Sequence, residues 1–392
     1  MTTHQPTTKN HQPLHICFLT HEYPMKGRTQ GGIGSVVQTL GKALVRKGHR
    51  VSVAGIRRDI DESVRSNDEG VELYFEPAAN WPAANFYPNV RKLLRLLEEI
   101  HTRHPVDIVE GSEFAFAFFP KRFFAKKVIR MHGGHHFFAV TLGKKPALWR
   151  GFQEKRSFAN ADALIAVSRF VGETTRELLG FSDAFEVIYN IVDTRKFYEA
   201  DPAKVEAGRL LFVGTVTEKK GIRQLVQAMP AIRRAVPRAH LRIVGRDWND
   251  PKTGASYTEY LRGFIVDEVR DAVEIVGALP HDTIPAELEQ AEVCIYPSHM
   301  EAMPIAWLEA LGMGKAVVAS RLGPGPETVV DKKTGLLCDP FDPQDIAEKV
   351  IAMLQNPEEA ARMGKRARED ILRRFDPDAT VERNIAFYRS LL

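Results

Sequence analysis

The segment 298–314 combines residues that can bind phosphate and sugar hydroxyls. Pro304 suits the first turn of a helix, because the N–H that it lacks has no partner there. Gly312 and Gly314 are typical of a helix end. We therefore predict a helix over residues 302–311. The free N–H groups and the positive dipole end at its N-terminus are a ready site for a phosphate group.

Glu301 and Glu309 stand at the two ends of this predicted helix. A helix turns by about 100° per residue, so the two carboxylates would lie roughly 80° apart around the axis, on one broad face. A rise of about 1.5 Å per residue separates them by about 12 Å, which is too far for an acid/base pair. The separation suits a ligand with polar ends and a diphosphate between them, as in a nucleotide sugar. Two solvated helix carboxylates are an equally good interpretation of the spacing alone.

The composition is that of an ordinary globular protein of more than one domain. Of 392 residues, 44% are hydrophobic and 27% are charged. The net charge of +4 favours phosphate-bearing ligands or an anionic membrane surface but proves neither. Cys17, Cys294 and Cys338 have no paired spacing, which fits a reducing compartment better than a disulfide framework.

The chain predicts neither a membrane span nor a secretion signal. Residues 1–13 are polar, and the longest strongly apolar stretch, 114–119, is far shorter than the roughly 20 residues that a spanning helix requires. We therefore expect a cytoplasmic protein, with peripheral contact at the inner face of the membrane as the alternative. We expect no nucleic acid partner.

Short aliphatic runs alternate with longer helical patterns along the chain, which predicts an α/β fold of parallel sheets with helices on both faces. A polar, charged stretch at 193–208 separates two Rossmann-like domains, 14–195 and 205–372. The last residues, 377–392, predict an amphipathic helix that packs back on the first domain. The predicted strands are 14–20, 51–54, 71–75, 107–109, 127–130, 163–167, 185–188, 209–213, 241–244, 273–276, 293–296 and 316–319, and the predicted helices include 34–47, 89–101, 225–235 and 346–354.

Both predicted domains open with an apolar strand, a glycine-bearing loop and a helix. In the first domain the loop contains Gly31 and Gly32, and in the second it contains Gly214 and Gly221. Ligands of open α/β sheets bind at the carboxyl ends of the strands. Two such sheets that face each other would therefore share one cleft.

Several ordered landmarks together resemble a known family. They are Glu301 and Glu309 followed by Gly314–Ser320, the loop Gly31-Gly32 followed by Gly48–Val51, His132-Gly133 after Val128–Met131, Ala166–Ser168, Asn190–Asp193, and Phe212–Gly214 with Lys220–Ile222. This order, which covers nearly the whole chain, is similar to that of the retaining glycosyltransferases of family 4 (group 1). The resemblance implies their GT-B fold, in which two Rossmann-like domains face a cleft.

The resemblance also implies a role for each matching residue. Glu309 would hold the donor ribose, Lys220 would neutralise the diphosphate, and Glu301 would contact the sugar hydroxyls near the reaction centre. His132 would lie beside the transferring sugar and would donate a hydrogen bond or position the sugar, not act as a nucleophile. The other donor-binding positions would be Gly31, Gly32, Gly214, Thr215, Arg246, Gly277 and Leu279, together with the backbone N–H groups of Ala302, Met303 and Ile305.

The chain departs from the family pattern at three positions. Thr215 stands where the family usually has an arginine that binds the diphosphate, so Arg246 or Lys219 would have to substitute for it. Ala302 and Ile191 each stand where glycine is common, and we interpret both changes as tolerable.

Three patterns that suggest a metal or a dinucleotide have simpler interpretations. The Asp-x-Asp pattern at 59–61 lies in a charged stretch that predicts a solvated loop. His132, His135 and His136 lack the spacing and the further ligand of a metal site. The glycines at 32–34 lack the third glycine and the following acid of a dinucleotide fingerprint. We therefore expect neither a metal ion nor a cofactor.

Aromatic and basic residues gather at 114–127. We favour a buried helix with a basic rim; the alternative is an interfacial patch that meets a membrane and a lipid-linked acceptor.

The resemblance thus implies a metal-independent transferase that moves a sugar from a UDP- or GDP-linked donor to a carbohydrate or lipid-linked acceptor, in the synthesis of cell-surface polysaccharide or glycolipid. Retention would follow a front-face route in which the leaving diphosphate helps to deprotonate the acceptor. The alternatives are a non-catalytic nucleotide-sugar-binding subunit and another enzyme of the same fold, such as a sugar epimerase.

Overall fold

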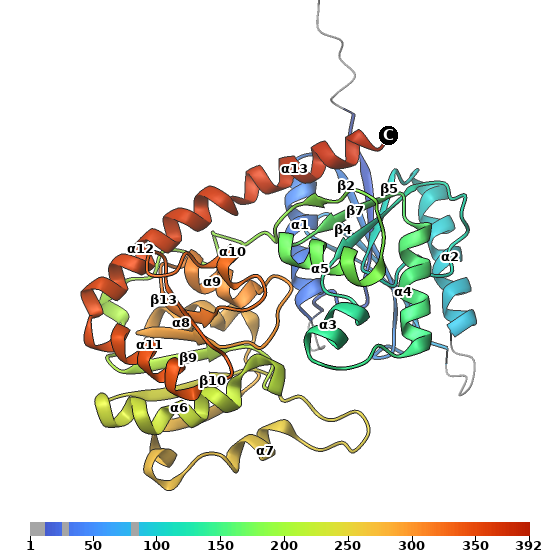
Figure 1. Ribbon diagram of the computed structural model, residues 1–392. Helices are drawn as coiled ribbons and strands as arrows, with labels where there is room; N and C mark the ends of the chain where they lie inside the picture. Colours follow the sequence, from blue (N-terminus) through green and yellow to red (C-terminus); the bar gives the residue numbers. More distant parts are fainter. Residues whose placement is uncertain (1–11, 26–30, 80–85) are drawn as a thin grey trace, which may run out of the picture.

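The computed structural model describes residues 12–25, 31–79 and 86–392. They form two α/β domains that lie side by side, each built on a largely parallel sheet with helices on its faces (Figure 1). The predicted fold class is confirmed.

The first domain contains an eight-stranded sheet in the order β3-β4-β2-β1-β5-β6-β7-β8. Every neighbouring pair is parallel except β3 and β4. The edge strand β3 was not predicted, because its residues are polar and mostly exposed and therefore lack an apolar run. The strands are β1 (His15–Leu19), β2 (Arg50–Arg57), β3 (Val64–Asp68), β4 (Val71–Pro77), β5 (Ile108–Gly111), β6 (Lys126–Met131), β7 (Ala163–Ala166) and β8 (Glu186–Val187).

The helices of the first domain are α1 (Gly32–Arg46), α2 (Phe86–Arg103), α3 (His135–Thr141), α4 (Leu148–Asn160) and α5 (Arg169–Leu179).

The helix predicted at 114–119 is absent from this described segment, which forms consecutive turns. Its buried aromatic residues pack beneath α4, and side chains of α4 bind its backbone. Ser157 accepts the N–H of Phe116, and Arg156 donates to the carbonyl of Ala117 at 2.7 Å. The burial that we favoured is correct for Phe116 and Phe119, but the helical conformation was wrong.

The second domain contains a six-stranded, fully parallel sheet in the order β11-β10-β9-β12-β13-β14. Strands β12 and β13 are buried along their whole length, which explains their uninterrupted apolar sequences. The strands are β9 (Arg209–Val213), β10 (His240–Val244), β11 (Val273–Gly277), β12 (Val293–Tyr296), β13 (Ala316–Ser320) and β14 (Leu336–Cys338).

The helices of the second domain are α6 (Ile222–Ala235), α7 (Tyr257–Arg262), α8 (Ile284–Gln290), α9 (Ile305–Gly312), α10 (Gly325–Thr328), α11 (Pro343–Gln355) and α12 (Pro357–Arg374), with short 3-10 turns at Pro202–Lys204, Glu218–Lys220, Asp267–Ala272 and His281–Thr283.

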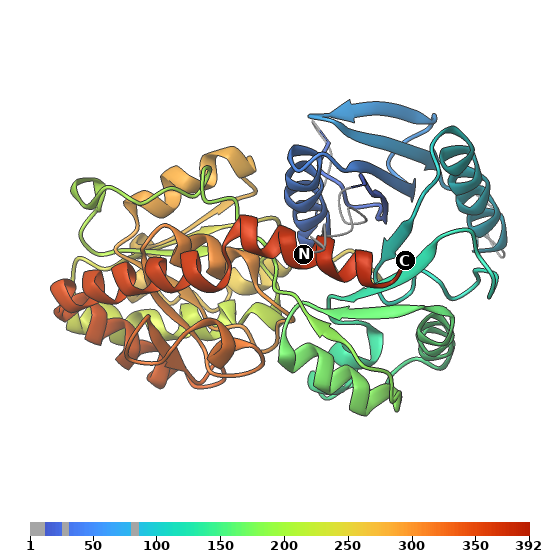
Figure 2. The ribbon, with the colours of Figure 1, turned by 90° about the horizontal axis from the view of Figure 1, so that it is seen from above.

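The final helix, α13 (Pro377–Ser390), leaves the second domain and returns to the first, where it packs against α1. Seen from above, α12 and α13 run one after the other across both domains (Figure 2). A buried polar network holds α13 there. Tyr388 donates to Glu110 at 2.7 Å, and Arg130 binds both Glu110 and Asn384.

The strand order places two ligand-binding edges opposite each other. In both sheets the order reverses beside the first strand of the domain, between β1 and β5 and between β9 and β12. Parallel α/β sheets bind their ligands at the carboxyl ends of the strands at such a reversal. The loops that follow these four strands are therefore the expected walls of a binding site.

Candidate active site

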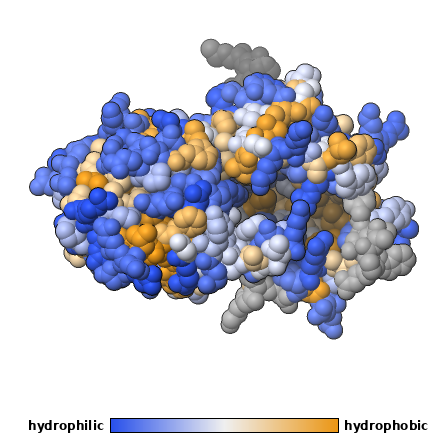
Figure 3. Space-filling view, turned by 60° about the horizontal axis from the view of Figure 1, so that its bottom comes forward, coloured by the Kyte–Doolittle hydropathy of each residue, from blue (hydrophilic) through white to orange (hydrophobic). Residues whose placement is uncertain are grey.

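A cavity of about 1190 Å³ lies between the two domains. The space-filling view shows the molecule hollowed there (Figure 3). Loops from both domains line it: those after β1 and β6 in the first domain, and those after β9, β10 and β12 in the second. The described loop after β5, which the strand order also predicts as a wall, does not contribute. The lining residues include Gly31, Gly32, His132, Phe138 and Lys144 from the first domain, and Gly214, Thr215, Lys219, Lys220, Arg246, Glu301, Ala302, Met303 and Ile305 from the second.

Most of the predicted donor-binding residues thus lie around one cavity. Among the described residues, the lining does not include Gly277, Leu279 or Glu309. Glu309 is buried within α9, and one of its carboxylate oxygens lies 2.9 Å from Nε2 of His281. Its proposed contact with a ribose stays a prediction.

The helix predicted at 302–311 begins three residues later than expected. Pro304 is the N-cap of α9, with extended backbone angles, and α9 starts at Ile305. The carbonyls of the preceding residues are already bound by the first domain. Ser168 donates to the carbonyl of Ala302 at 2.7 Å, and Asn190 donates to that of Met303 at 3.2 Å.

Glu301 therefore lies in a loop outside the helix. The helical spacing that we assigned to Glu301 and Glu309 does not apply, because only Glu309 lies on α9. The segment 301–304 instead forms a cavity wall whose carbonyls face the other domain. The N–H groups in the first turn of α9 have no partner within the helix and can bind a ligand at the edge of this wall.

The carboxylate of Glu301 pairs with the ammonium group of Lys220 and accepts a hydrogen bond from Ser298 at 2.9 Å. Burial opposes ionisation of Glu301, but the ammonium groups of Lys220 and Lys219 outweigh it and lower the pKa of the carboxyl group. Two residues predicted to contact the donor thus bind each other.

Lys219 adds a second ammonium group to the same wall. Its Nζ lies 4.5 Å from the centre of the Phe138 ring, across the interface between the domains. Burial, with a smaller contribution from Lys220, lowers the pKa of Lys219 against the attraction of Glu301. An anion that enters the cavity would stabilise the charged form of Lys219, because the anion compensates the buried positive charge.

Thr215 and Arg246 lie side by side on the wall. The guanidinium Nε of Arg246 is 3.5 Å from the hydroxyl of Thr215. Arg246 therefore brings a cation next to the position at which the family usually has arginine.

His132 faces the cavity from the first domain, at the end of β6. Burial and the nearby charge of Arg130 lower the pKa of His132 to about 3. The imidazole is therefore neutral near pH 7 and can donate or accept a hydrogen bond. Its backbone N–H donates to the side-chain carboxyl group of buried Glu113 at 2.6 Å.

A second buried carboxylate supports the loop that follows His132. Glu154 of α4 accepts hydrogen bonds from the backbone N–H and Nδ1 of His136. A Cβ atom on Gly134 would lie 1.8 Å from Glu154 and 2.9 Å from Glu113. Only glycine fits between these two side chains. His136 is therefore held in place by a buried carboxylate.

The glycine loop at the start of α1 makes close approaches on both sides. A Cβ atom on Gly34 would lie 1.8 Å from the carbonyl oxygen of Glu22. A Cβ atom on Gly32 would lie 4.0 Å from the side chain of Ile305, on the other domain. The backbone of this loop therefore faces the start of α9 across the cavity.

Sequence reasoning missed several lining residues, among them Phe138, Lys144, Trp248, Tyr257 and His299. They belong to irregular segments or short helices, and we assigned none of them a role, although His299 lies within the segment 298–314. The hydroxyl of Tyr257 donates to Glu218 at 2.5 Å, a contact between distant segments that only the folded chain creates.

In the part of the chain that the structure describes, no group of three or more His, Cys, Asp or Glu residues is arranged to hold a metal ion. Asp59, from the Asp-x-Asp pattern, forms a bidentate ion pair with Arg57. Within the same residues, no helix has the length and hydropathy to cross a membrane.

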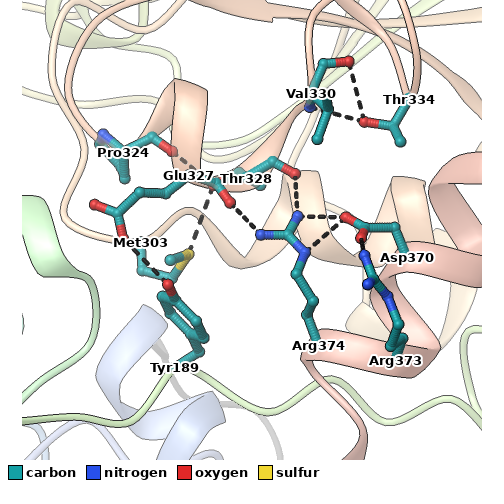
Figure 4. A network of polar contacts seen from close by, with 10 residues as sticks. All are labelled: Tyr189, Met303, Pro324, Glu327, Thr328, Val330, Thr334, Asp370, Arg373 and Arg374. Atoms are coloured by element: carbon teal, nitrogen blue, oxygen red, sulfur yellow. Dashed lines mark hydrogen bonds and ion pairs between the residues drawn. The ribbon is translucent and has the colours of Figure 1, made fainter.

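Further contacts join the domains beside the cavity. Glu327 of the second domain accepts the backbone N–H groups of Arg169 and Phe170, at the start of α5 in the first. Figure 4 shows the surroundings of Glu327: Tyr189 approaches its carboxylate, and Arg374 binds its backbone carbonyl.

Comparisons with known proteins agree with this arrangement. Residues 30–196 match the model of Glycosyltransferase Family 4, and residues 194–370 match that of Glycosyl transferases group 1. Glycogen synthase from Mycobacterium tuberculosis is 27% identical over 401 residues, which cover 93% of this chain and 91% of that protein.

A GDP-mannose-dependent alpha-(1-6)-phosphatidylinositol monomannoside mannosyltransferase from Mycolicibacterium smegmatis is 32% identical over 222 residues, which cover 52% of this chain and 56% of that protein. Among solved structures, sucrose-phosphate synthase from Thermosynechococcus elongatus superposes with a TM-score of 0.81 at 22% identity, over 96% of this chain and 99% of that one. The two family matches together span both domains, and the chain therefore belongs to the family 4 (group 1) glycosyltransferases of the GT-B fold.

Proposed function

We propose that the protein transfers a sugar from a nucleotide-diphosphate donor to a carbohydrate or lipid-linked acceptor, with retention at the anomeric carbon and without a metal ion. The observation that carries this proposal is the cavity between the domains, whose second-domain wall includes Lys219, Lys220 and Arg246 as well as the start of α9. Three cations and free N–H groups suit a diphosphate, which carries its charge on several oxygens.

These groups would act by electrostatic stabilisation. When the bond between sugar and diphosphate breaks, negative charge grows on the diphosphate, and fixed cations lower the energy of that state. Lys220 would then exchange Glu301 for the diphosphate, which would free the carboxylate for the sugar hydroxyls. The neutral imidazole of His132, on the opposite wall, would bind the sugar.

The relatives support the donor and acceptor classes. A donor bound through a nucleoside diphosphate matches the GDP-mannose named for the mannosyltransferase. The same name includes a phosphatidylinositol acceptor, and glycogen synthase builds a polysaccharide. UDP- or GDP-linked sugars are the donors that we propose, and the protein would act in the cytoplasm.

A second candidate function is that of a nucleotide-sugar-binding subunit without activity, because Thr215 stands where the family usually has an arginine that binds the diphosphate. Release of free nucleoside diphosphate from UDP- and GDP-sugars, in the absence of acceptor, separates the two. We expect slow release by the wild type and much slower release by Glu301→Gln, with magnesium or with EDTA. Donor binding without any release would favour the subunit, and dependence on magnesium would contradict the metal-independent mechanism.

A further inference from the structure

Within the segment 112–161, which contains α4, every exposed charged side chain is basic. The segment 112–161 contains two acidic residues, Glu113 and Glu154, and both are buried. Eight basic residues of this segment are exposed: Lys121, Arg122, Lys126, Lys144, Lys145, Arg150, Lys155 and Arg156.

Large apolar side chains stand among these cations. At the N-terminal end of α4, Leu148 is 93% exposed, Trp149 57% and Phe152 50%. The rings of Trp149 and Phe152 stack at 5.7 Å, and the ring of Phe118 lies 6.2 Å from that of Trp149. We call Leu148, Trp149 and Phe152, with Lys144, Lys145, Arg150 and Lys155, the α4 surface.

The body of α4 is firmly held, so its exposed end is presented in a fixed position. Phe158 is buried, and fully buried Glu154 binds His136. The residues before α4 are held as well, because the N–H of Ala147 donates to Nε2 of His135 at 2.7 Å.

The α4 surface adjoins the cavity. Thr141, Leu142, Gly143 and Lys144 line the cavity, and α4 begins at Leu148. Lys144 therefore belongs both to the α4 surface and to the lining of the cavity. A molecule bound along the α4 surface would have its head group near the cavity entrance.

We propose that the α4 surface docks the protein on an anionic lipid bilayer. Apolar side chains at the tip of a helix, ringed by lysine and arginine, suit the boundary between head groups and acyl chains. The basic residues would be attracted to anionic lipids, and the exposed Leu148, Trp149 and Phe152 would leave water. Given the proposed function, this docking assigns the acceptor to the lipid-linked class.

The test is flotation of the full chain with vesicles of phosphatidylcholine alone or mixed with phosphatidylglycerol. We expect binding to the mixed vesicles that falls with salt. The variant Leu148→Ser/Trp149→Ser/Phe152→Ser should lose about tenfold or more of its affinity for the mixed vesicles. The variant Lys144→Glu/Lys145→Glu should also lose about tenfold or more.

Two controls come from exposed residues of the second domain. Val266→Ser, at an apolar side chain that is 49% exposed, and Lys252→Glu should bind like the wild type. Thermal unfolding of the α4 variants should match that of the wild type, since the substituted side chains are largely outside the core. Nucleotide binding by the Leu148→Ser/Trp149→Ser/Phe152→Ser variant, followed with UDP and GDP, tests the donor site separately from docking, because none of these three residues lines the cavity.

Equal flotation of wild type and both α4 variants would overturn the proposal. Binding of single-stranded RNA in preference to vesicles would assign the α4 surface to nucleic acid instead. A dimer in sedimentation that the triple variant dissociates would assign it to a second copy of the chain. Either result would contradict membrane docking.

Discussion

The carboxylate of Glu327 accepts the backbone N–H of Phe170 at 2.7 Å, so a residue of the second domain caps a helix of the first. The first-turn N–H groups of a helix have no partner within the helix, and a carboxylate there also interacts favourably with the helix dipole. This contact joins the two domains, and we expect it to break if they move apart. It therefore links the stability of α5 to the closure of the cavity.

Replacing Glu327 by Ala should loosen domain closure. The N–H groups of Arg169 and Phe170 should exchange hydrogen about tenfold faster or more, because each loses a charged acceptor. Hydrogen exchange with mass spectrometry measures this. Glu268→Ala removes another glutamate of the same domain and should leave α5 unchanged; unaltered exchange at the start of α5 in Glu327→Ala would show that the cap does not hold the domains.

Replacing Glu301 by Gln should separate the binding of diphosphate from the use of sugar. Lys220 loses its partner, so affinity for UDP or GDP alone should rise, by about fivefold for roughly 1 kcal/mol of released attraction. Turnover of the nucleotide sugar should fall, since the carboxylate proposed to bind the sugar is absent. Calorimetric titration measures the first effect. Weaker nucleotide binding in this variant would contradict the exchange of partners by Lys220.

The pH dependence of stability should report on Glu113. Burial raises the pKa of this carboxyl group to about 8 from an ordinary value of 4.5, so the folded protein holds a proton that the unfolded chain releases. Its contribution to the free energy of unfolding is therefore complete below about pH 4.5 and is lost as the pH rises to about 8.

The variant Glu113→Gln isolates this contribution. The free energy of unfolding of the wild type minus that of the variant should fall between about pH 5 and about pH 8, by a few kcal/mol at about 1.4 kcal/mol per pKa unit. Urea unfolding at several pH values gives this difference. A difference that rises over the same range would contradict the raised pKa.

The network of Tyr388, Glu110 and Arg130 should anchor α13. Tyr388→Phe leaves a buried carboxylate oxygen with one donor fewer, which costs about 1–3 kcal/mol. Glu110→Ala leaves the Arg130 charge without its buried partner, and the loss should reach roughly 3–5 kcal/mol. Chemical unfolding measures both. Phe387→Leu, at a partly buried neighbour of Tyr388, is the control, and equal losses in all three would show that packing alone holds α13.

Local patterns in the sequence predicted the parallel sheets, because buried strands have aliphatic runs between glycine loops and helices. They failed where tertiary contacts decide the conformation. The residues of β3 are polar, and β3 forms by pairing with β4. The segment 114–119 has the apolar content of a helix, but α4 binds its backbone in another conformation.

The candidate site was also predicted only in part, because local patterns place the loops but not the contacts between distant segments. Loops that follow strands of known order converge on one cleft, which placed His132, Lys220 and Glu301 together. The start of α9 was misplaced, because Ser168 and Asn190 bind carbonyls that a helix would have used. Contacts between residues more than a hundred positions apart cannot be read from helix or strand periodicity.

The most direct test of the account is thermal stabilisation by UDP-, GDP- and ADP-linked sugars, with magnesium or with EDTA. The variant Lys220→Ala removes the cation that we assign to the diphosphate, and Lys252→Ala removes an exposed lysine of the same domain. We predict a rise in Tm with one nucleotide class, unaffected by EDTA, lost in Lys220→Ala and retained in Lys252→Ala. No rise with any of these donors, or a rise that persists in Lys220→Ala, would contradict a donor site between the two domains.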